Sequence, residues 1–431
     1  MNILIIDSDK CGLPFALRCD SEGHSVRLWT PPTKIGDGMI DKINEWRPSM
    51  GWADLIFLTD NSKLGSALRP FFRAGYPIFG ANEDGAKLEL DREAGQGCFE
   101  RFGIETLPFE TFTSYDKAID YVKKEMKPFV SKPWGGNPDK SLSYVPKSPE
   151  DLVCRLQRWK KDGVKGEFLL QEKIDGAEMA VGGWFGPGGW SKWLNENWEE
   201  KRMMAGGLGV NTGEMGTVMR YVKKSQLFND VLKPVTEYLE EISYVGYIDV
   251  NCLVDEKGTP WPLEFTCRPG WPHFNLCMAL HQGDPVAWMV DLLKGKDTLD
   301  VSEQTCVGVV MAMGDYPWDL LPPNDSEGWP IRGLSSKTLP SLALSSVMRG
   351  KAPVAKGKNI AEQETVVTAG SYVLVATGLG DSVTEAQESV YDTCHEIGWP
   401  PHQIYRNDIG DRLEEDLPKL QEHGFADGME F

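Results

Sequence analysis

The stretch of residues 247–270, YIDVNCLVDEKGTPWPLEFTCRPG, constrains the fold more than any other part of the chain. Two runs rich in β-branched, aromatic and other apolar residues, Tyr247–Val254 and Trp261–Cys267, flank the polar turn Asp255–Gly258. A turn of this kind between two such runs is typical of an antiparallel hairpin. The sequence therefore predicts two paired strands here.

The simplest register of this hairpin pairs Asp255 with Gly258 and thereby sets Asp249 opposite Glu264. Side chains alternate between the two faces of a strand, so further polar residues should share the face of this pair. They are Asn251, Thr266 and Arg268.

Two opposed carboxylates repel each other on a bare sheet. A hard divalent cation removes the repulsion, because Mg²⁺ takes oxygen ligands and is commonly shared between one or two carboxylates and substrate phosphates. This interpretation makes the hairpin a metal and phosphate platform. The alternative is a solvated polar strand face, and an odd-length loop would shift the register and separate Asp249 from Glu264.

Composition limits the classes of protein. A chain of 431 residues can form two to four domains, and a net charge of −19 argues against general binding of nucleic acid or anionic membranes. The nine cysteines contain no C-x-x-C pair, which argues against a zinc site or a disulfide framework. With no apolar run of membrane-spanning length and no signal-like start, we expect a cytoplasmic protein, either a monomer or a small homo-oligomer.

Strand and helix signals alternate near the N-terminus, which predicts an α/β segment with a parallel sheet. Later segments mix helices with hairpin-like strands. The stretch 298–353 is rich in Pro, Gly and Ser, with short strands such as Cys306–Met311, and is interpreted as a hinge region. Residues 206–216 are glycine-rich and are expected to form a loop. The expected domains are 1–105, 106–190, 191–330 and 331–431.

Three elements before the hairpin would suit a nucleotide. Lys132 ends an apolar strand, where its ammonium could reach a phosphate, although a surface lysine that closes a strand is the commoner case. The loop 135–140, GGNPDK, could present backbone N–H groups to phosphates or be a plain turn. The strand 169–178 could offer backbone groups to an adenine edge and carboxylates, from Glu172 and Glu178, to ribose.

The order of these parts resembles the ATP-grasp fold. More narrowly, the chain resembles the phosphoribosylamine–glycine ligase family over nearly its whole length. The matching motifs are Leu88–Arg92, Gln171–Glu178, Lys201-Arg202 with Asn211–Gly216, Leu263–Arg268, Cys306–Ala312, Tyr316-Pro317, Val366–Gly370 and Arg406–Gly410. The resemblance implies an N-terminal Rossmann-like domain, an ATP-grasp core of two subdomains and a small C-terminal α/β domain.

The resemblance also implies a ligation with three substrates. ATP would phosphorylate a carboxylate, expected to be glycine, and an amine would displace phosphate to form an amide. Arg268, Arg202 and Asn211 are the implied catalytic residues. The implied ATP-binding residues are Arg92 and Lys132 at the phosphates, Glu172, Lys173 and Ile174 at the adenine edge, and Glu178 at the ribose. The implied ligands of Mg²⁺ or Mn²⁺ are Asp249, Glu264 and Thr266.

Departures from the family concentrate where the amine would bind. The family's glycine-rich phosphate loop is replaced by 7–13, DSDKCGL, and aromatic residues enter at Trp271 and Phe274. Two hypotheses follow. The chain is an active ligase with a changed amine acceptor, such as a modified nucleoside or nucleotide, or it is a catalytically silent relative that binds nucleotide as a regulator or scaffold.

Overall fold

Five strands near the N-terminus form a parallel sheet in the computed structural model, which describes residues 1–134, 142–314, 316–318, 325–400 and 402–431. Ile3 and Ile5 face one apolar core, while Leu4 and Ile6 face another, so the central strand is buried on both sides. The predicted parallel α/β arrangement is confirmed. In spatial order the strands are β3 (Lys42–Ile43), β2 (Ser25–Trp29), β1 (Asn2–Ile6), β4 (Leu55–Leu58) and β5 (Ile78–Phe79).

Helices connect these strands and lead out of the sheet. An aspartate or asparagine side chain caps the start of each of the last two helices: Asn82 accepts from the Gly85 N–H, and Asp91 accepts from the N–H groups of Glu93 and Ala94. The helices are α1 (Leu13–Ser21), α2 (Gly65–Arg73), α3 (Glu83–Leu90) and α4 (Arg92–Arg101).

A small sheet of three strands follows, with its own apolar core under two helices. The predicted helix at 115–125 and the strand that carries Lys132 are both present. The elements are β6 (Phe109–Phe112), α5 (Tyr115–Glu125), β7 (Phe129–Pro133), α6 (Pro149–Asp162) and β8 (Phe168–Glu172). The predicted phosphate loop 135–140 lies outside the described residues.

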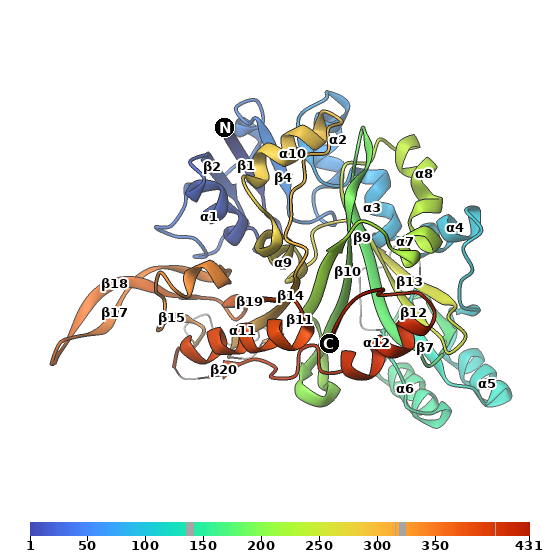
Figure 1. The fold of residues 1–431 in the computed structure, drawn as a ribbon. Coiled ribbons are helices and arrows are strands. Elements are labelled where there is room, and N and C mark those ends of the chain that lie inside the picture. The colour runs from blue at the N-terminus through green and yellow to red at the C-terminus, as the bar shows by residue number, and fades with distance from the viewer. Residues whose placement is uncertain (135–141, 315, 319–324, 401) are drawn as a thin grey trace.

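The largest sheet has nine strands and crosses the centre of the molecule (Figure 1). Its path runs β13, β12, β9, β10, β11, β14, β19 and β16, and β20 pairs with β14. The bounds are β9 (Ala177–Gly186), β10 (Gly189–Met204), β11 (Leu208–Val222), β12 (Gly246–Val254), β13 (Pro260–Thr266), β14 (Thr305–Met313), β16 (Leu342–Leu344), β19 (Leu374–Gly380) and β20 (Gln403–Ile404).

Helices lie against this sheet, and a three-stranded sheet projects from it as a long arm (Figure 1). The helices are α7 (Gln226–Val231), α8 (Thr236–Glu241), α9 (His273–Leu280), α10 (Pro285–Leu293), α11 (Val383–Glu396) and α12 (Leu413–Glu422). The arm consists of β15 (Glu327–Pro330), β17 (Val347–Lys356) and β18 (Asn359–Ala369).

Two expectations about loops are wrong. Most of the glycine-rich stretch 206–216 belongs to β11, because its residues continue the long antiparallel pairing with β10. The strand predicted at 306–311 is confirmed as part of β14, but the stretch 298–353 is not a hinge, since β14 is fully buried and paired with β11 and β19. Local composition does not reveal such distant strand partners.

The hairpin of β12 and β13 has a different register from the predicted one. Asp255 pairs with Thr259 rather than Gly258, and a bulge follows between Asn251 and Cys252. Each irregularity moves the pairing by one residue, so Asp249 lies opposite Thr266 and Glu264 lies opposite Asn251. The total slip of two residues leaves all four side chains on one face, as predicted.

None of the helices in the described part of the chain is long and apolar enough to cross a membrane. The four domain boundaries expected from the sequence remain a proposal.

Candidate active site

Lys132, Arg92 and Glu264 come from three different elements and share one electrostatic neighbourhood. Lys132 ends β7 and donates to the Gln171 side-chain oxygen at 2.8 Å, while Arg92 at the start of α4 pairs with Glu264 on β13 at 3.3 Å. Burial, followed by the positive charge of Arg92, lowers the pKa of Lys132 to about 8. An anion such as a phosphate would restore the charge of this ammonium.

A second cationic group, Lys201 on β10, belongs to the same neighbourhood. Its ammonium lies 3.1 Å from a carboxylate oxygen of Glu199 and 3.9 Å from one of Glu178. Burial lowers the pKa of Lys201, but Glu199 and Glu178 outweigh burial, and the pKa lies above its ordinary value. Arg412, near the end of the chain, also approaches Glu178 at 3.5 Å. Sequence reasoning assigned Lys201 to a motif without a role and missed Glu199 and Arg412.

Asp249 is the most deeply buried carboxylate of the hairpin face. Burial, with the charge of Glu199 next, raises the pKa of Asp249 to about 8. The Tyr247 hydroxyl donates to Oδ2 at 3.0 Å, while Oδ1 is buried with no hydrogen-bond partner among the described residues. Glu214 on β11 is likewise buried, and burial raises its pKa well above the ordinary range. Asp249 on β12 and Glu214 on β11 belong to the same sheet, and each has one buried carboxyl oxygen with no partner among the described residues, which a cation or a bound donor would satisfy.

Arg268 follows directly after the hairpin and is held by Glu89 at the end of α3. The Arg268 Nε lies 3.0 Å from Glu89 Oε1, and Glu89 Oε2 accepts the backbone N–H of Cys267 at 2.8 Å. The Asn61 side chain donates to the same Glu89 oxygen at 2.9 Å and to the Cys267 carbonyl at 3.2 Å. The N-terminal sheet and the hairpin therefore meet at this arginine.

Burial lowers the pKa of the Arg268 guanidinium, but surrounding carboxylates outweigh burial and keep the pKa above its ordinary value. Those carboxylates are Glu89, Asp60, Asp9 and Asp249. The guanidinium thus stays charged and faces both the hairpin and the carboxyl edge of the N-terminal sheet.

The residues predicted at the adenine edge link β8 to β9. The Glu172 carboxylate pairs with Lys127 at 3.0 Å, and the Lys173 ammonium donates to the Pro146 carbonyl at 3.4 Å. Ile174 is half-buried and lies outside the strands, so it can offer an apolar contact as well as its backbone groups. These residues lie four to six positions before Glu178, which belongs to the cationic cluster.

Arg202 and Asn211 lie opposite each other in the β10–β11 hairpin. The Arg202 guanidinium donates to the Gly209 carbonyl at 2.9 Å, and its own carbonyl accepts from Arg406 at 3.1 Å. Among the described residues, no hydrogen bond or ion pair joins Arg202 or Asn211 to Lys132 or Arg268. Their catalytic role remains a prediction.

The described part of the site offers few protein ligands for a metal ion. No group of three or more His, Cys, Asp or Glu side chains that could hold a metal occurs among the described residues. Magnesium at a nucleotide site usually needs only one or two carboxylates, because waters and phosphates fill its other positions. The buried, partnerless oxygen of Asp249 and the carboxylate of Glu264 on the same face fit this type of site.

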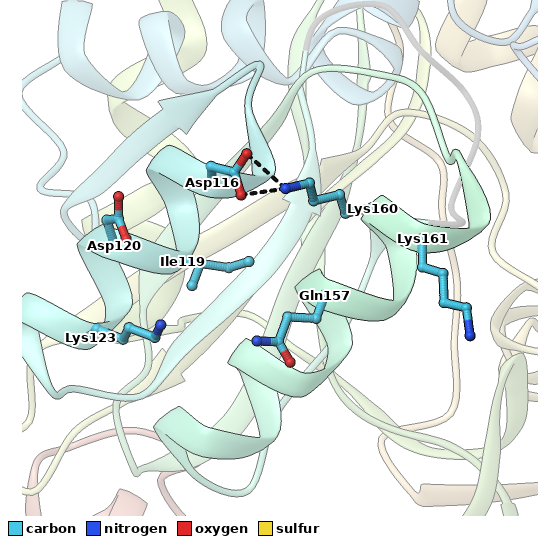
Figure 2. Close-up of a pocket in the computed structure, with 7 residues that line it drawn as sticks. All are labelled: Asp116, Ile119, Asp120, Lys123, Gln157, Lys160 and Lys161. Atoms are coloured by element: carbon cyan, nitrogen blue, oxygen red, sulfur yellow. Dashed lines mark hydrogen bonds and ion pairs between the residues drawn. The ribbon is translucent and has the colours of Figure 1, made fainter.

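A hollow of about 440 Å³ between α5 and α6 lies outside this cluster (Figure 2). Figure 2 shows that Asp116 and Lys160 pair across it, at 2.6 Å. None of the candidate site residues lines this hollow, and we assign it no part in the chemistry.

The fold and the site define an ATP-grasp enzyme. Two family models match: the ATP-grasp (A) domain of phosphoribosylglycinamide synthetase over residues 93–273, and the C domain of the same enzyme over residues 306–412. Together they cover about two thirds of the chain. The chain belongs to the phosphoribosylglycinamide synthetase family.

Individual relatives agree with this family. The chain is 29% identical over 363 residues to the phosphoribosylamine–glycine ligase of Salmonella typhimurium, covering 80% of each. It is 28% identical over 361 residues to that of Neisseria meningitidis, covering 79% of this chain and 80% of the relative. The crystal structure of the Thermotoga maritima phosphoribosylamine–glycine ligase matches with a TM-score of 0.71 at 19% identity, covering 95% of this chain and 100% of that one.

Proposed function

We propose that the chain is an ATP-dependent, ADP-forming ligase that joins the carboxylate of glycine to an amine. The γ-phosphoryl group of ATP passes to a carboxylate oxygen, which leaves ADP and an acyl phosphate. The amine nitrogen then attacks the acyl carbon, the C–O bond to phosphate breaks, and the nitrogen releases a proton as the amide forms. Homology makes a catalytically silent relative the less favoured reading.

One observation carries the proposal: cations and carboxylates from four separate elements act on the ammonium of Lys132, which comes from a fifth. The groups that shift the pKa of Lys132 besides burial are Arg92, Glu264, Lys201 and Glu178. A protein that only needed a stable fold would gain more from apolar residues at these positions, because buried charges cost desolvation. A polyanion with a divalent cation balances the whole set.

Each candidate residue would contact a different part of ATP or of the transferring phosphoryl group. Lys132 and Arg92 would bind the ATP phosphates, and Glu178 would accept from the ribose hydroxyls. Glu172, Lys173 and Ile174 would line the adenine edge. Arg268 would hold the transferring phosphoryl group in its planar guanidinium fork, which Glu89 already orients.

Mg²⁺, when bound with ATP, would neutralise the developing charge on the phosphates. Glu264 and Asp249 would hold it, with Thr266 beside Asp249 as a further oxygen. Arg202 and Asn211, at the far part of the β10–β11 hairpin, would cover the acyl phosphate and exclude water.

The test measures ADP release by the full chain with ATP, Mg²⁺ and glycine against a panel of amines, beside ATP binding by calorimetry. ADP release that requires both glycine and an amine, with formation of a glycyl amide detected by mass spectrometry, supports the proposal. ATP binding with no turnover of any amine would support the silent nucleotide-binding relative instead.

A further inference from the structure

The loop between β1 and α1 lies at the carboxyl edge of the parallel sheet, where ligands of such sheets bind. It lies beside the loop after β4, where Asp60 accepts from the Ser8 hydroxyl, and the charges of Asp9 in the first loop and Asp60 in the second both act on the proposed catalytic Arg268. Trp271, three residues after Arg268, donates its indole N–H to the Thr59 carbonyl at 3.4 Å. The loop therefore borders the space beyond Arg268, where an attacking amine would sit.

A phosphate group would ordinarily bind such a loop through free N–H groups at the helix start. Here the carboxylate of Asp7, within the same loop, already accepts hydrogen bonds from those N–H groups. Asp7 accepts from the Cys11 N–H at 3.0 Å and the Gly12 N–H at 2.9 Å, and the Thr59 hydroxyl donates to it at 2.9 Å. Pro14, in the first turn of α1, has no N–H to give. The anion position is occupied by a side chain that is 1% exposed.

The rim of this loop adds negative charge. Asp60 accepts from the Ser8 hydroxyl at 3.0 Å and from the Ser62 backbone at 2.9 Å, and Asp9 pairs with Lys63 at 2.5 Å. Lys63 is thus neutralised by a neighbour in the same rim. Lys10 is exposed in the loop itself. With Asp7 and Glu89 included, carboxylates outnumber the ammonium and guanidinium groups around this space.

Asn61 provides an independent observation that points to a ligand with hydrogen-bond donors. Its side chain is 7% exposed, and its amide nitrogen donates to Glu89 and to the Cys267 carbonyl. Both partners are acceptors, so the nitrogen must face them and the oxygen must face the other way. That oxygen, Oδ1, is buried with no partner among the described residues. A donor from a bound molecule would satisfy it.

We propose that the amine acceptor of this chain carries no phosphate and is an amino sugar or nucleoside whose hydroxyl or amino donors face Asp60 and Asn61. This inference rests on the proposed ligase function and narrows its acceptor class. The related ligases named above act on phosphoribosylamine, as their name states. The phosphate of such a substrate would find the N–H groups of the loop already bonded to Asp7, and the nearby carboxylates of Asp9 and Asp60 would repel it.

The first experiment compares two amines that differ only in the phosphate, ribosylamine and its 5-phosphate, each formed from the sugar and ammonia. With wild-type protein, ATP, Mg²⁺ and glycine, we expect kcat/KM for the unphosphorylated amine to be at least about tenfold higher, because like-charge contacts are strongly unfavourable. A preference for the phosphorylated amine overturns the inference but leaves the ligase function standing.

The second experiment measures binding of ribose 5-phosphate by calorimetry without nucleotide, so it does not depend on turnover. Wild type should show no binding, and Asp7→Ala, which frees the Cys11 and Gly12 donors, should gain it. The matched control is Asp284→Ala, which removes the carboxylate that caps α10. Binding by wild type, or equal gains in both variants, overturns the inference. If neither amine is turned over, the panel of amines described above decides the ligase function, and this binding measurement decides whether the loop accepts a phosphate.

Discussion

The guanidinium of Arg268 is fixed by the carboxylate of Glu89, a residue 179 positions earlier in the chain. The same carboxylate accepts the Cys267 N–H and the Asn61 amide, so it fixes the backbone as well as the side chain. Glu89 thus acts through the arginine that it orients, and we regard it as a positioning residue.

Replacing Glu89 with glutamine should lower kcat about 10- to 100-fold while ATP binding changes little, because the arginine loses its orienting charge but the nucleotide cluster is untouched. Single-turnover ADP formation and calorimetric ATP binding separate the two effects. Glu93→Gln, in the exposed first turn of α4, is the control. An equal loss of ATP affinity in Glu89→Gln would point to a general structural defect.

Replacing Glu264 with glutamine should reduce turnover at least about 100-fold and leave the fold intact, because a carboxylate that is half exposed has little packing to lose. Circular dichroism checks the fold, and ADP release checks activity over a range of Mg²⁺ concentrations. Glu256→Gln, in the turn of the same hairpin, should behave as wild type. Full activity of Glu264→Gln would remove Glu264 from the metal site.

ATP affinity should weaken as pH rises through about 8, because the pKa of Lys132 is lowered to about 8 by burial and by Arg92. A neutral amine loses its attraction to phosphate. Lys132→Arg keeps its charge in this range, so its ATP affinity should be nearly flat between pH 7 and 9. Calorimetry at several pH values tests both proteins. Parallel curves would exclude Lys132 as the titrating group.

Without nucleotide, the titration of Lys132 should make the folded chain more stable as pH rises, whereas it makes ATP binding weaker. Its pKa is lower in the folded chain than the ordinary value of 10.5, so the unfolded chain binds more protons between about pH 8 and 10.5. The free energy of unfolding should therefore gain a positive contribution from Lys132 as pH rises through that window. Urea unfolding of wild type and Lys132→Arg at pH 8 and 10 compares the two slopes, and equal slopes would contradict the assignment.

Removing the charge of Arg406 should lower the free energy of unfolding by about 3 kcal/mol, because the carboxylates of Glu200 and Asp408 would stay charged and largely buried without its guanidinium. The Arg406 side chain is 3% exposed and lies 3.2 Å from Glu200 and 2.7 Å from Asp408. The comparison is Arg406→Gln against Lys337→Gln. Lys337 is 79% exposed in its pair with Glu396, so its loss should cost less than about 1 kcal/mol. Similar unfolding midpoints in urea for the two variants would contradict this account.

The sequence predicted local elements well where the signal was local. The parallel N-terminal sheet, the helix at 115–125 and the strand before Lys132 all follow from alternating or periodic patterns. The hairpin face was also predicted correctly, although the pairing itself was wrong. A longer turn at Thr259 and a bulge after Asn251 each shift the register by one residue, and the shared face survives because side-chain alternation has a period of two.

Long-range partners could not be predicted from local pattern. Nothing in the sequence around Glu89 indicates that it pairs with Arg268. The position of Lys201 depends on a β-bulge after Glu200, which changes the register between β10 and β11. The strand predicted at 306–311 forms as β14, but its place between β11 and β19, which are far apart in sequence, could not be predicted from local pattern. The catalytic and ligand-binding assignments themselves remain predictions that the experiments above test.

The contacts of Arg406 and Arg412 with β10 have a consequence for folding during synthesis. Both arginines contact the Glu199–Arg202 segment from more than 200 residues downstream. During synthesis, Glu200 therefore gains its two arginine partners only after residues 406–412 have been made. A chain that stops before Arg406 lacks both arginines, including Arg412 beside Glu178, so its nucleotide cluster is incomplete.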